Sequence, residues 1–122
     1  MVAVLALCAP LACGGAGGTP SSGIDRSRQV GSLDDTDRVT LCDWSNGLLG
    51  GYAHTITCGP SLARNSDATQ MECTQRLAVF TGCDLSVGDY EICMRAIAAT
   101  VCELNPGGNA PECWDYETCL GP

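Results

Sequence analysis

The cysteines constrain this chain more than any other feature. Ten of its 122 residues are cysteine, a density near that of small secreted domains held together by disulfides. Structural zinc sites use close pairs such as C-x2-C, whereas the closest spacings here are Cys8 to Cys13 and Cys113 to Cys119. We therefore expect disulfides, and we expect neither a metal site nor a cofactor.

The small apolar content explains why covalent bridges are needed. The chain has one Phe and two Trp, and a domain of roughly 90 residues buries little more than 60% of the surface of its unfolded chain. Eight cysteines follow the N-terminal region, an even number, so all of them can pair with one another. These predicted disulfide cysteines are Cys42, Cys58, Cys73, Cys83, Cys93, Cys102, Cys113 and Cys119.

The charge balance excludes two classes of partner. Fourteen acidic residues stand against six arginines, and there is no lysine, which gives a formal net charge of −8. Nucleic acids and anionic membrane surfaces repel such a chain. The acidity is typical of a soluble exported protein, and an acidic binding face is the alternative; we interpret Glu112, Asp115 and Glu117 near the C-terminus as a solvent-exposed face. We expect an unknown protein or cell-envelope partner, and membrane contact only through a lipid anchor.

The N-terminal region predicts export. Residues 1–13 form an apolar run that has the length of a signal-peptide core and is too short to span a bilayer. No positively charged segment precedes it, so we expect the true start codon to lie upstream. Residues 14–33 are rich in Gly, Ser, Thr and Pro and read as a flexible tether. The predicted domain is then residues 34–122.

A lipid anchor is predicted at Cys13. The sequence LACGG at residues 11–15 resembles the bacterial lipobox, although Pro10 stands where that motif usually has Leu. Acylation of Cys13 and loss of Cys8 with the signal segment would leave the even set of eight. By resemblance to Gram-negative sorting, Gly14 permits the outer membrane or cell surface. The alternative is soluble export to the periplasm or medium, after cleavage near residue 12 or 16.

The residue pattern predicts an all-α fold, a small disulfide-stapled bundle of about four helices with one irregular excursion. We expect helices over residues 34–49, from 66 or 67 to 82, over 86–104, and over a short final segment capped by Asn109. Residues 51–64 form the excursion and include a short extended stretch. The acids Asp34, Asp35 and Asp37 read as a helix cap, because an EF-hand loop starting there would need Gly at its sixth position.

Eight cysteines allow 105 pairings, and sequence alone cannot choose among them. The third helix carries the strongest apolar stripe, formed by Tyr90, Cys93, Met94, Ile97, Val101 and Leu104. Cys93 and Cys102 lie nine positions apart, which places them on opposite sides of a helix, about 180° apart. We therefore expect them to bond to different neighbours.

Few residues stand out as candidates for chemistry. His54 is the only histidine, and it lies in the excursion without a recognisable catalytic motif around it. Trp44 and Trp114 are the largest apolar side chains; we expect both to pack in the core, with partner binding as the alternative, because Trp is enriched at binding hot spots. Arg64 is a candidate specificity residue if residues 51–64 form an exposed inhibitory loop.

Together, the sequence LCDW at residues 41–44, GGY at residues 50–52 and the later cysteines resemble an uncharacterised group of small cysteine-rich exported proteins, some of them lipoproteins, from myxobacteria. The resemblance covers residues 37–119. It implies export and disulfides, but no activity and no functional residues.

Three hypotheses about function follow. The leading one is a non-enzymatic interaction or envelope-structural module, exported and anchored at Cys13. The second is a secreted, disulfide-rich inhibitor of a protease or another enzyme, acting through residues 51–64. The third, remote, is a small hydrolase that uses His54.

Overall fold

The computed structural model describes residues 21–108 and 110–120. Within them the chain forms four α-helices: α2 (Asp35–Gly47), α3 (Gln70–Ala78), α4 (Val87–Ala99) and α5 (Trp114–Leu120). A two-stranded sheet and two short 3-10 helices complete the fold: β1 (Thr55–Thr57), β2 (Ala63–Asn65), η3 (Val30–Ser32) and η4 (Pro111–Cys113). The prediction of a small helical domain is confirmed, but the fold is not purely α-helical.

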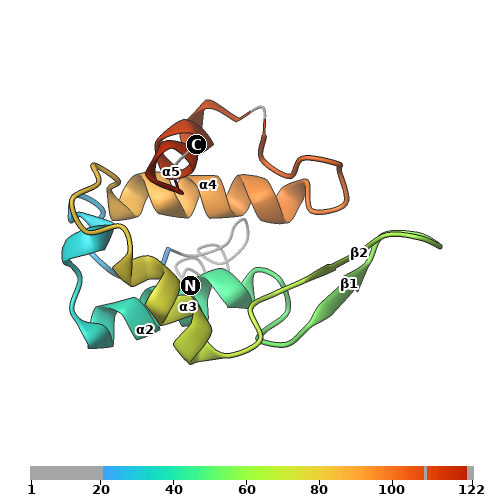
Figure 1. The fold of residues 1–122 in the computed structure, drawn as a ribbon, viewed down its shortest axis with the longest axis horizontal. Helices are drawn as coiled ribbons and strands as arrows, with labels where there is room; N and C mark the ends of the chain where they lie inside the picture. Colours follow the sequence, from blue (N-terminus) through green and yellow to red (C-terminus); the bar gives the residue numbers. More distant parts are fainter. Residues whose placement is uncertain (1–20, 109, 121–122) are drawn as a thin grey trace, which may run out of the picture.

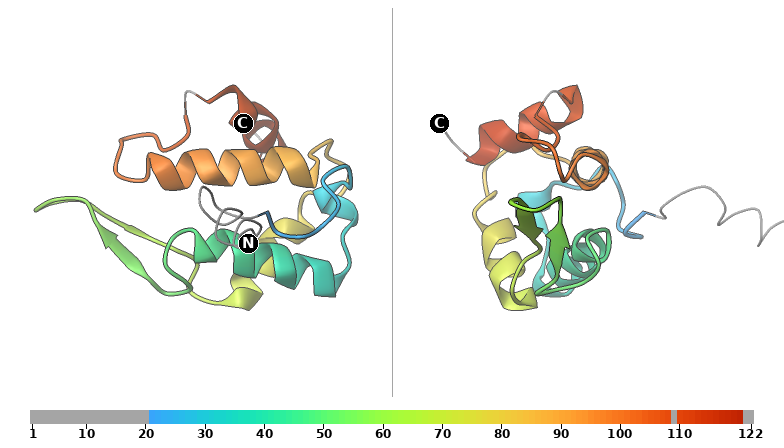
Figure 2. Two further views of the ribbon diagram at one scale, coloured as in Figure 1. Left: turned by 180° about the vertical axis from the view of Figure 1, so that it is seen from behind. Right: turned by 90° about the vertical axis from the view of Figure 1, so that its right-hand side faces the viewer.

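The helices lie in two layers (Figure 1). α2 packs against α3 in one layer, and α4 packs against η4 and α5 in the other. The hairpin of β1 and β2 extends away from the body at one end of the molecule (Figure 1), and the view from behind shows the same projection (Figure 2, left). The described part of the chain contains no helix long and apolar enough to cross a membrane.

The predicted irregular excursion is an antiparallel β-hairpin, and this corrects the all-α prediction. Ile56 pairs with Arg64 in the middle of the ribbon, and the N–H of Cys58 donates to the carbonyl oxygen of Leu62 across the loop at 2.8 Å. The β-branched residues of β1 favour extended backbone. A disulfide from Cys58 to Cys102 holds the end of the hairpin, so the ribbon does not depend on two short strands alone.

Side-chain caps determine where the helices begin. Asp34 caps α2 by accepting from the N–H of Asp37, as the acidic cluster predicted. Ser86 caps α4 in the same way. The second helix starts at residue 70, later than predicted, because the backbone N–H of Ser66 continues the hairpin pairing and donates to the carbonyl of His54. Thr69 therefore provides the cap of α3.

α4 ends at Ala99, five residues before the predicted end. Thr100 fixes this end: its hydroxyl donates to the carbonyl of Ala96 and accepts from the N–H of Gly107. Gly107 has φ +70, and a Cβ there would lie 2.8 Å from Ile97. Only glycine therefore fits at this position, where the chain turns back toward α4. The predicted core residue Leu104 is consequently 93% exposed.

The predicted tether is partly wrong. Ile24, Val30 and Leu33 are buried, and the backbone N–H of Ser22 donates to the fully buried carboxylate of Glu91. Arg26 lies 3.6 Å from the other oxygen of that carboxylate. The packed domain therefore begins by residue 22 and not at residue 34. The rest of the predicted tether, the signal segment and Cys13 lie outside the described residues.

All eight predicted cysteines form disulfides. Two bridges lie within the layers: Cys42–Cys73 joins α2 to α3, and Cys93–Cys113 joins α4 to η4. Two bridges lie at opposite ends: Cys83–Cys119 joins the connection before α4 to α5, and Cys58–Cys102 joins the hairpin to the segment after α4. The prediction that Cys93 and Cys102 bond to different neighbours is confirmed.

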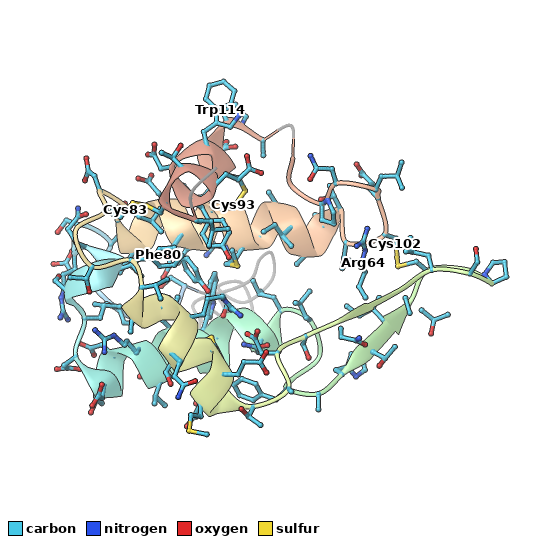
Figure 3. All side chains as sticks on the ribbon, in the orientation of Figure 1. Arg64, Phe80, Cys83, Cys93, Cys102 and Trp114 are labelled. Carbon is cyan, nitrogen blue, oxygen red and sulfur yellow. A yellow bond between two sulfur atoms is a disulfide. The ribbon has the colours of Figure 1, made fainter. Side chains whose placement is uncertain are left out.

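The apolar core lies at one end of the molecule. Phe80 and Tyr90 are its largest members and are fully buried. Figure 3 shows Phe80 at the end opposite to Cys102 and Arg64. Smaller residues complete this core cluster: Ile24, Val30, Leu33, Leu41, Leu77, Leu85 and Val87, with the Cys42–Cys73 bridge.

Candidate functional site

α5 is a short helix that is fixed at both ends. Cys113, directly before it, is bonded to Cys93 and is buried, and Cys119 near its end is bonded to Cys83. Between them Tyr116 points inward, with its ring 5.6 Å from that of Phe80. Burial raises the pKa of the Tyr116 phenol. These three anchors determine which side of the helix faces the core.

The inward direction of Tyr116 determines what α5 presents to solvent. At about 100° per residue, Trp114 and Thr118 lie about 160° from Tyr116, on the opposite side of the helix. Glu117 lies about 100° from Tyr116, on the flank nearer to Trp114. Trp114 is 61% exposed, and Figure 3 shows its indole pointing away from the body. The expectation that Trp114 packs in the core is therefore wrong. We call these three side chains, with the flanking Glu112 and Asp115, the Trp114 face.

The Trp114 face is acidic. Glu112, Asp115 and Glu117 are exposed, and none of them forms an ion pair or a side-chain hydrogen bond with any residue that the structure describes. The face thus combines a large apolar side chain with three unneutralised carboxylates on a rigid support.

Trp44 has a different environment from Trp114. It lies on α2, is half-buried and packs against the core. The guanidinium of Arg95, on α4, sits 5.4 Å from the centre of its ring, within the range of a cation–π contact. This contact joins the two layers, so the structure gives Trp44 a place in the packing between layers.

Arg64 is also engaged within the protein. Its guanidinium donates to the carbonyl oxygens of Glu103 at 2.8 Å and Leu104 at 3.3 Å. These bonds hold β2 against the segment that follows α4, beside the Cys58–Cys102 bridge. A partner that bound Arg64 as a specificity residue would have to break them.

His54 is exposed at the base of the hairpin. Its ring lies over Gly50, so closely that a Cβ there would be 2.6 Å from the ring carbon Cδ2. The imidazole forms no hydrogen bond or ion pair with the residues that the structure describes. Among those residues there is also no group of three or more His, Cys, Asp and Glu that could hold a metal ion.

A polar network that the sequence analysis missed lies between the layers. Arg76 on α3 binds both carboxylate oxygens of Asp67, and the Asn46 amide donates to the same carboxylate at 2.9 Å. Burial raises the pKa of Asp67, but the hydrogen bonds from Arg76 and Asn46 outweigh it and hold that pKa below its usual value. Asp67 and Arg76 are nine residues apart, in a loop and a helix, so no periodicity revealed the pair.

The network lines a cleft of about 160 Å³, with Met94 and Ile97 of α4 and Tyr116 of α5 on the other side. Cavities for small molecules usually measure about 300–1,000 Å³. The hydrogen-bonding atoms of Asn46 and Asp67 are already used within the protein. We therefore interpret the cleft as the boundary, or seam, between the two helix layers and not as a binding site for a small molecule.

No family model, curated protein or solved structure matches this chain.

Proposed function

We propose that this chain is a non-enzymatic interaction module that works outside the cytoplasm and binds a protein partner through the Trp114 face. The observation that carries the proposal is the exposure of Trp114 on a helix whose two ends are bonded by Cys93–Cys113 and Cys83–Cys119. Trp is the residue most enriched at binding hot spots. A surface that is already rigid loses little conformational entropy when it binds.

The disulfides support the location. Four bridges form and persist in an oxidising compartment and not in a reducing cytosol. The lipid anchor at Cys13 is the finer part of the proposal. It rests on the sequence LACGG at residues 11–15, on the likeness to exported myxobacterial proteins, and on the fact that the eight later cysteines pair among themselves and leave Cys13 without a need for a partner.

Site-specific photocrosslinking tests the binding surface. A benzophenone amino acid at Thr118, which is exposed one turn beyond Trp114, should yield a discrete crosslinked protein in cells of the native organism. Trp114→Ala in the same chain should abolish that product. The matched control places the crosslinker at Val79, which is 65% exposed in the other layer. The same product from Val79, or an unchanged product with Trp114→Ala, would refute the proposed surface.

Intact mass spectrometry tests the anchor. The mature protein from the membrane fraction should begin at Cys13 with a diacylglycerol mass, and Cys13→Ser should release it into the soluble fraction. A wild-type protein that is soluble and cleaved near residue 12 or 16 would contradict the anchor and leave the binding surface untouched.

One observation favours enzyme inhibition as a second candidate function. The hairpin loop at Gly59, Pro60 and Ser61 is exposed, and the Cys58–Cys102 bridge braces it. Rigid exposed loops of this kind bind enzyme clefts with little entropic cost. Assays against a panel of secreted proteases, with Gly substituted at Pro60 and Ser61, would test this. Equal inhibition by the substituted loop would exclude the hairpin as the inhibitory element.

A further inference from the structure

The charge of the Trp114 face restricts what can bind to it. Residues 96–120 contain four acidic residues and neither Arg nor Lys. Three of these acids, Glu112, Asp115 and Glu117, lie within six positions around Trp114. The described part of the chain provides no cation for them, since its ion pairs use carboxylates elsewhere, on Glu91, Asp37, Asp35 and Asp67.

Helix stability explains these acids only in part. Carboxylates in the first turn of a helix are favoured by the dipole at its N-terminus, and Asp115 and Glu117 occupy that turn. The dipole does not explain why an indole is exposed among them. An isolated apolar side chain on the surface is common, but a Trp that is fixed between carboxylates is suited to a group that is both cationic and able to stack.

The protein already contains such a contact. Arg95 places its guanidinium over the ring of Trp44, 5.4 Å from the ring centre. Guanidinium is planar and weakly hydrated, so it stacks on an aromatic ring while its N–H groups bind carboxylates at the ring edge. Trp114 offers the same ring to solvent, with carboxylates beside it.

We infer that the partner contacts the Trp114 face through a cationic peptide segment, with an arginine or lysine stacked on the indole and bound to the surrounding carboxylates. This inference rests on the proposed function and adds the chemistry of the partner. A nucleic acid or an anionic membrane would meet three like charges at this face. A protein segment with spaced basic residues would meet complementary charge, which also speeds the encounter.

Isothermal titration with defined peptides tests the inference. The probe is a peptide of alternating Gly and Arg with three arginines, and the control peptide has Gln in place of each Arg. The Arg peptide should bind the wild-type protein, and the Gln peptide should not. Trp114→Ala should weaken binding by about tenfold, as expected for loss of a partly desolvated cation–π contact.

The carboxylates are tested separately from the indole. The combined variant Glu112→Gln, Asp115→Asn and Glu117→Gln should weaken binding by about fivefold at low salt and remove most of its salt dependence. Asp35→Asn is the control for loss of an acid elsewhere on the surface, because Asp35 is an exposed acid on α2 in the other layer, where it pairs with Arg38. It should leave the affinity unchanged. Intact disulfides, checked by mass, show that each variant has folded.

The results separate this inference from the proposed function. Equal binding of the Arg and Gln peptides, or no effect of Trp114→Ala on the Arg peptide, overturns the cationic partner even if the crosslink from Thr118 still depends on Trp114. Binding of spermidine as tight as that of the Arg peptide would reassign the face to free polyamines. Binding of the Arg peptide without any crosslink in cells would support the preference of the Trp114 face for cationic peptides, but it would refute the proposed function as a module that binds a protein partner there.

Discussion

The two ends of this molecule are stable for different reasons. At one end Phe80, Tyr90 and Leu33 are buried in an apolar core. At the other end, none of residues 47–65, all of which the structure describes, is fully buried. There the hairpin is held by the Cys58–Cys102 bridge and by the bonds of Arg64 to the segment after α4. We call these the core end and the hairpin end.

The difference between the two ends shows how a chain with few large apolar residues distributes its stabilising interactions. Its single Phe and all of its buried Leu and Val serve the core end, and covalent bonding replaces burial at the hairpin end. A region with few buried contacts opens locally at low free energy. The hairpin end should therefore depend on its bridge, whereas the core end should unfold only with the whole domain.

The largest effect is expected from the core end. Phe80→Ala removes a fully buried ring that packs against Tyr116, and such substitutions cost about 3–5 kcal/mol. Urea unfolding with intact disulfides measures the loss. Val79→Ala, at the exposed neighbouring residue, should change stability by less than about 0.5 kcal/mol. Similar losses for the two variants would contradict the location of the core.

The next effect separates the two ends most clearly. Removing the bridge with Cys58→Ser and Cys102→Ser should cost about 2 kcal/mol, less than the roughly 4 kcal/mol of the chain-entropy model. The reason is that loss of the bridge increases the conformational entropy of the hairpin in the folded state, and not only that of the unfolded chain. Hydrogen exchange should then be fast in residues 53–66 and 100–106 and unchanged in α2 and the first turns of α4. Loss of protection throughout the protein would show that the ends are not independent.

A smaller effect is expected at the seam between the layers. Asp67→Asn breaks the charged pair with Arg76 and should cost about 1.5 kcal/mol at pH 6. The folded-state pKa of Asp67 is lowered. The ionised carboxylate therefore contributes fully to the free energy of unfolding above the unfolded pKa of about 3.9, and this contribution is lost as the pH falls through the folded pKa. The difference between wild type and variant should therefore shrink below about pH 4. A difference that is constant from pH 6 to pH 3 would argue against the ionised pair.

The smallest effect is expected from Arg64→Gln. The variant loses guanidinium bonds to two exposed carbonyl groups, but the nearby bridge still holds the hairpin, so the cost should be about 1 kcal/mol or less. Hydrogen exchange of residues 63–66 is the sensitive measurement. In the protein that also lacks the Cys58–Cys102 bridge, the same substitution should increase exchange more strongly, and a purely additive result would show that the two restraints act separately.

The sequence predicted the parts of the fold that depend on local signals. Asp34 and Ser86 are short polar caps and mark helix starts correctly. The even cysteine count predicted complete pairing, although the partners depend on distant parts of the chain. Residues 21–33 were misread because their few apolar residues, such as Val30, are too widely spaced to show a period. Their burial depends on tertiary contacts that no local pattern records.

The candidate site was predictable only in part. Trp114 was a candidate because of its residue type, but its exposure depends on Tyr116 pointing into the core, and a helix of seven residues is too short for sequence to distinguish its faces. Arg64 was singled out as a charged residue in a presumed loop. Its position on β2 and the carbonyl groups 39 and 40 residues away that it binds are properties of the folded chain.

The order of the disulfides along the chain has a consequence for survival among peptidases. Every peptide bond from Cys42 to Cys119 lies inside at least one disulfide loop, because each loop overlaps the next. A protease that cuts once in this stretch, for example at the exposed loop beside Cys58, releases no fragment. The cleaved protein gains the mass of one water and migrates as one molecule until a thiol reductant is added. Breakdown in an oxidising compartment would therefore require a second cut within the same loop or the reduction of a bridge.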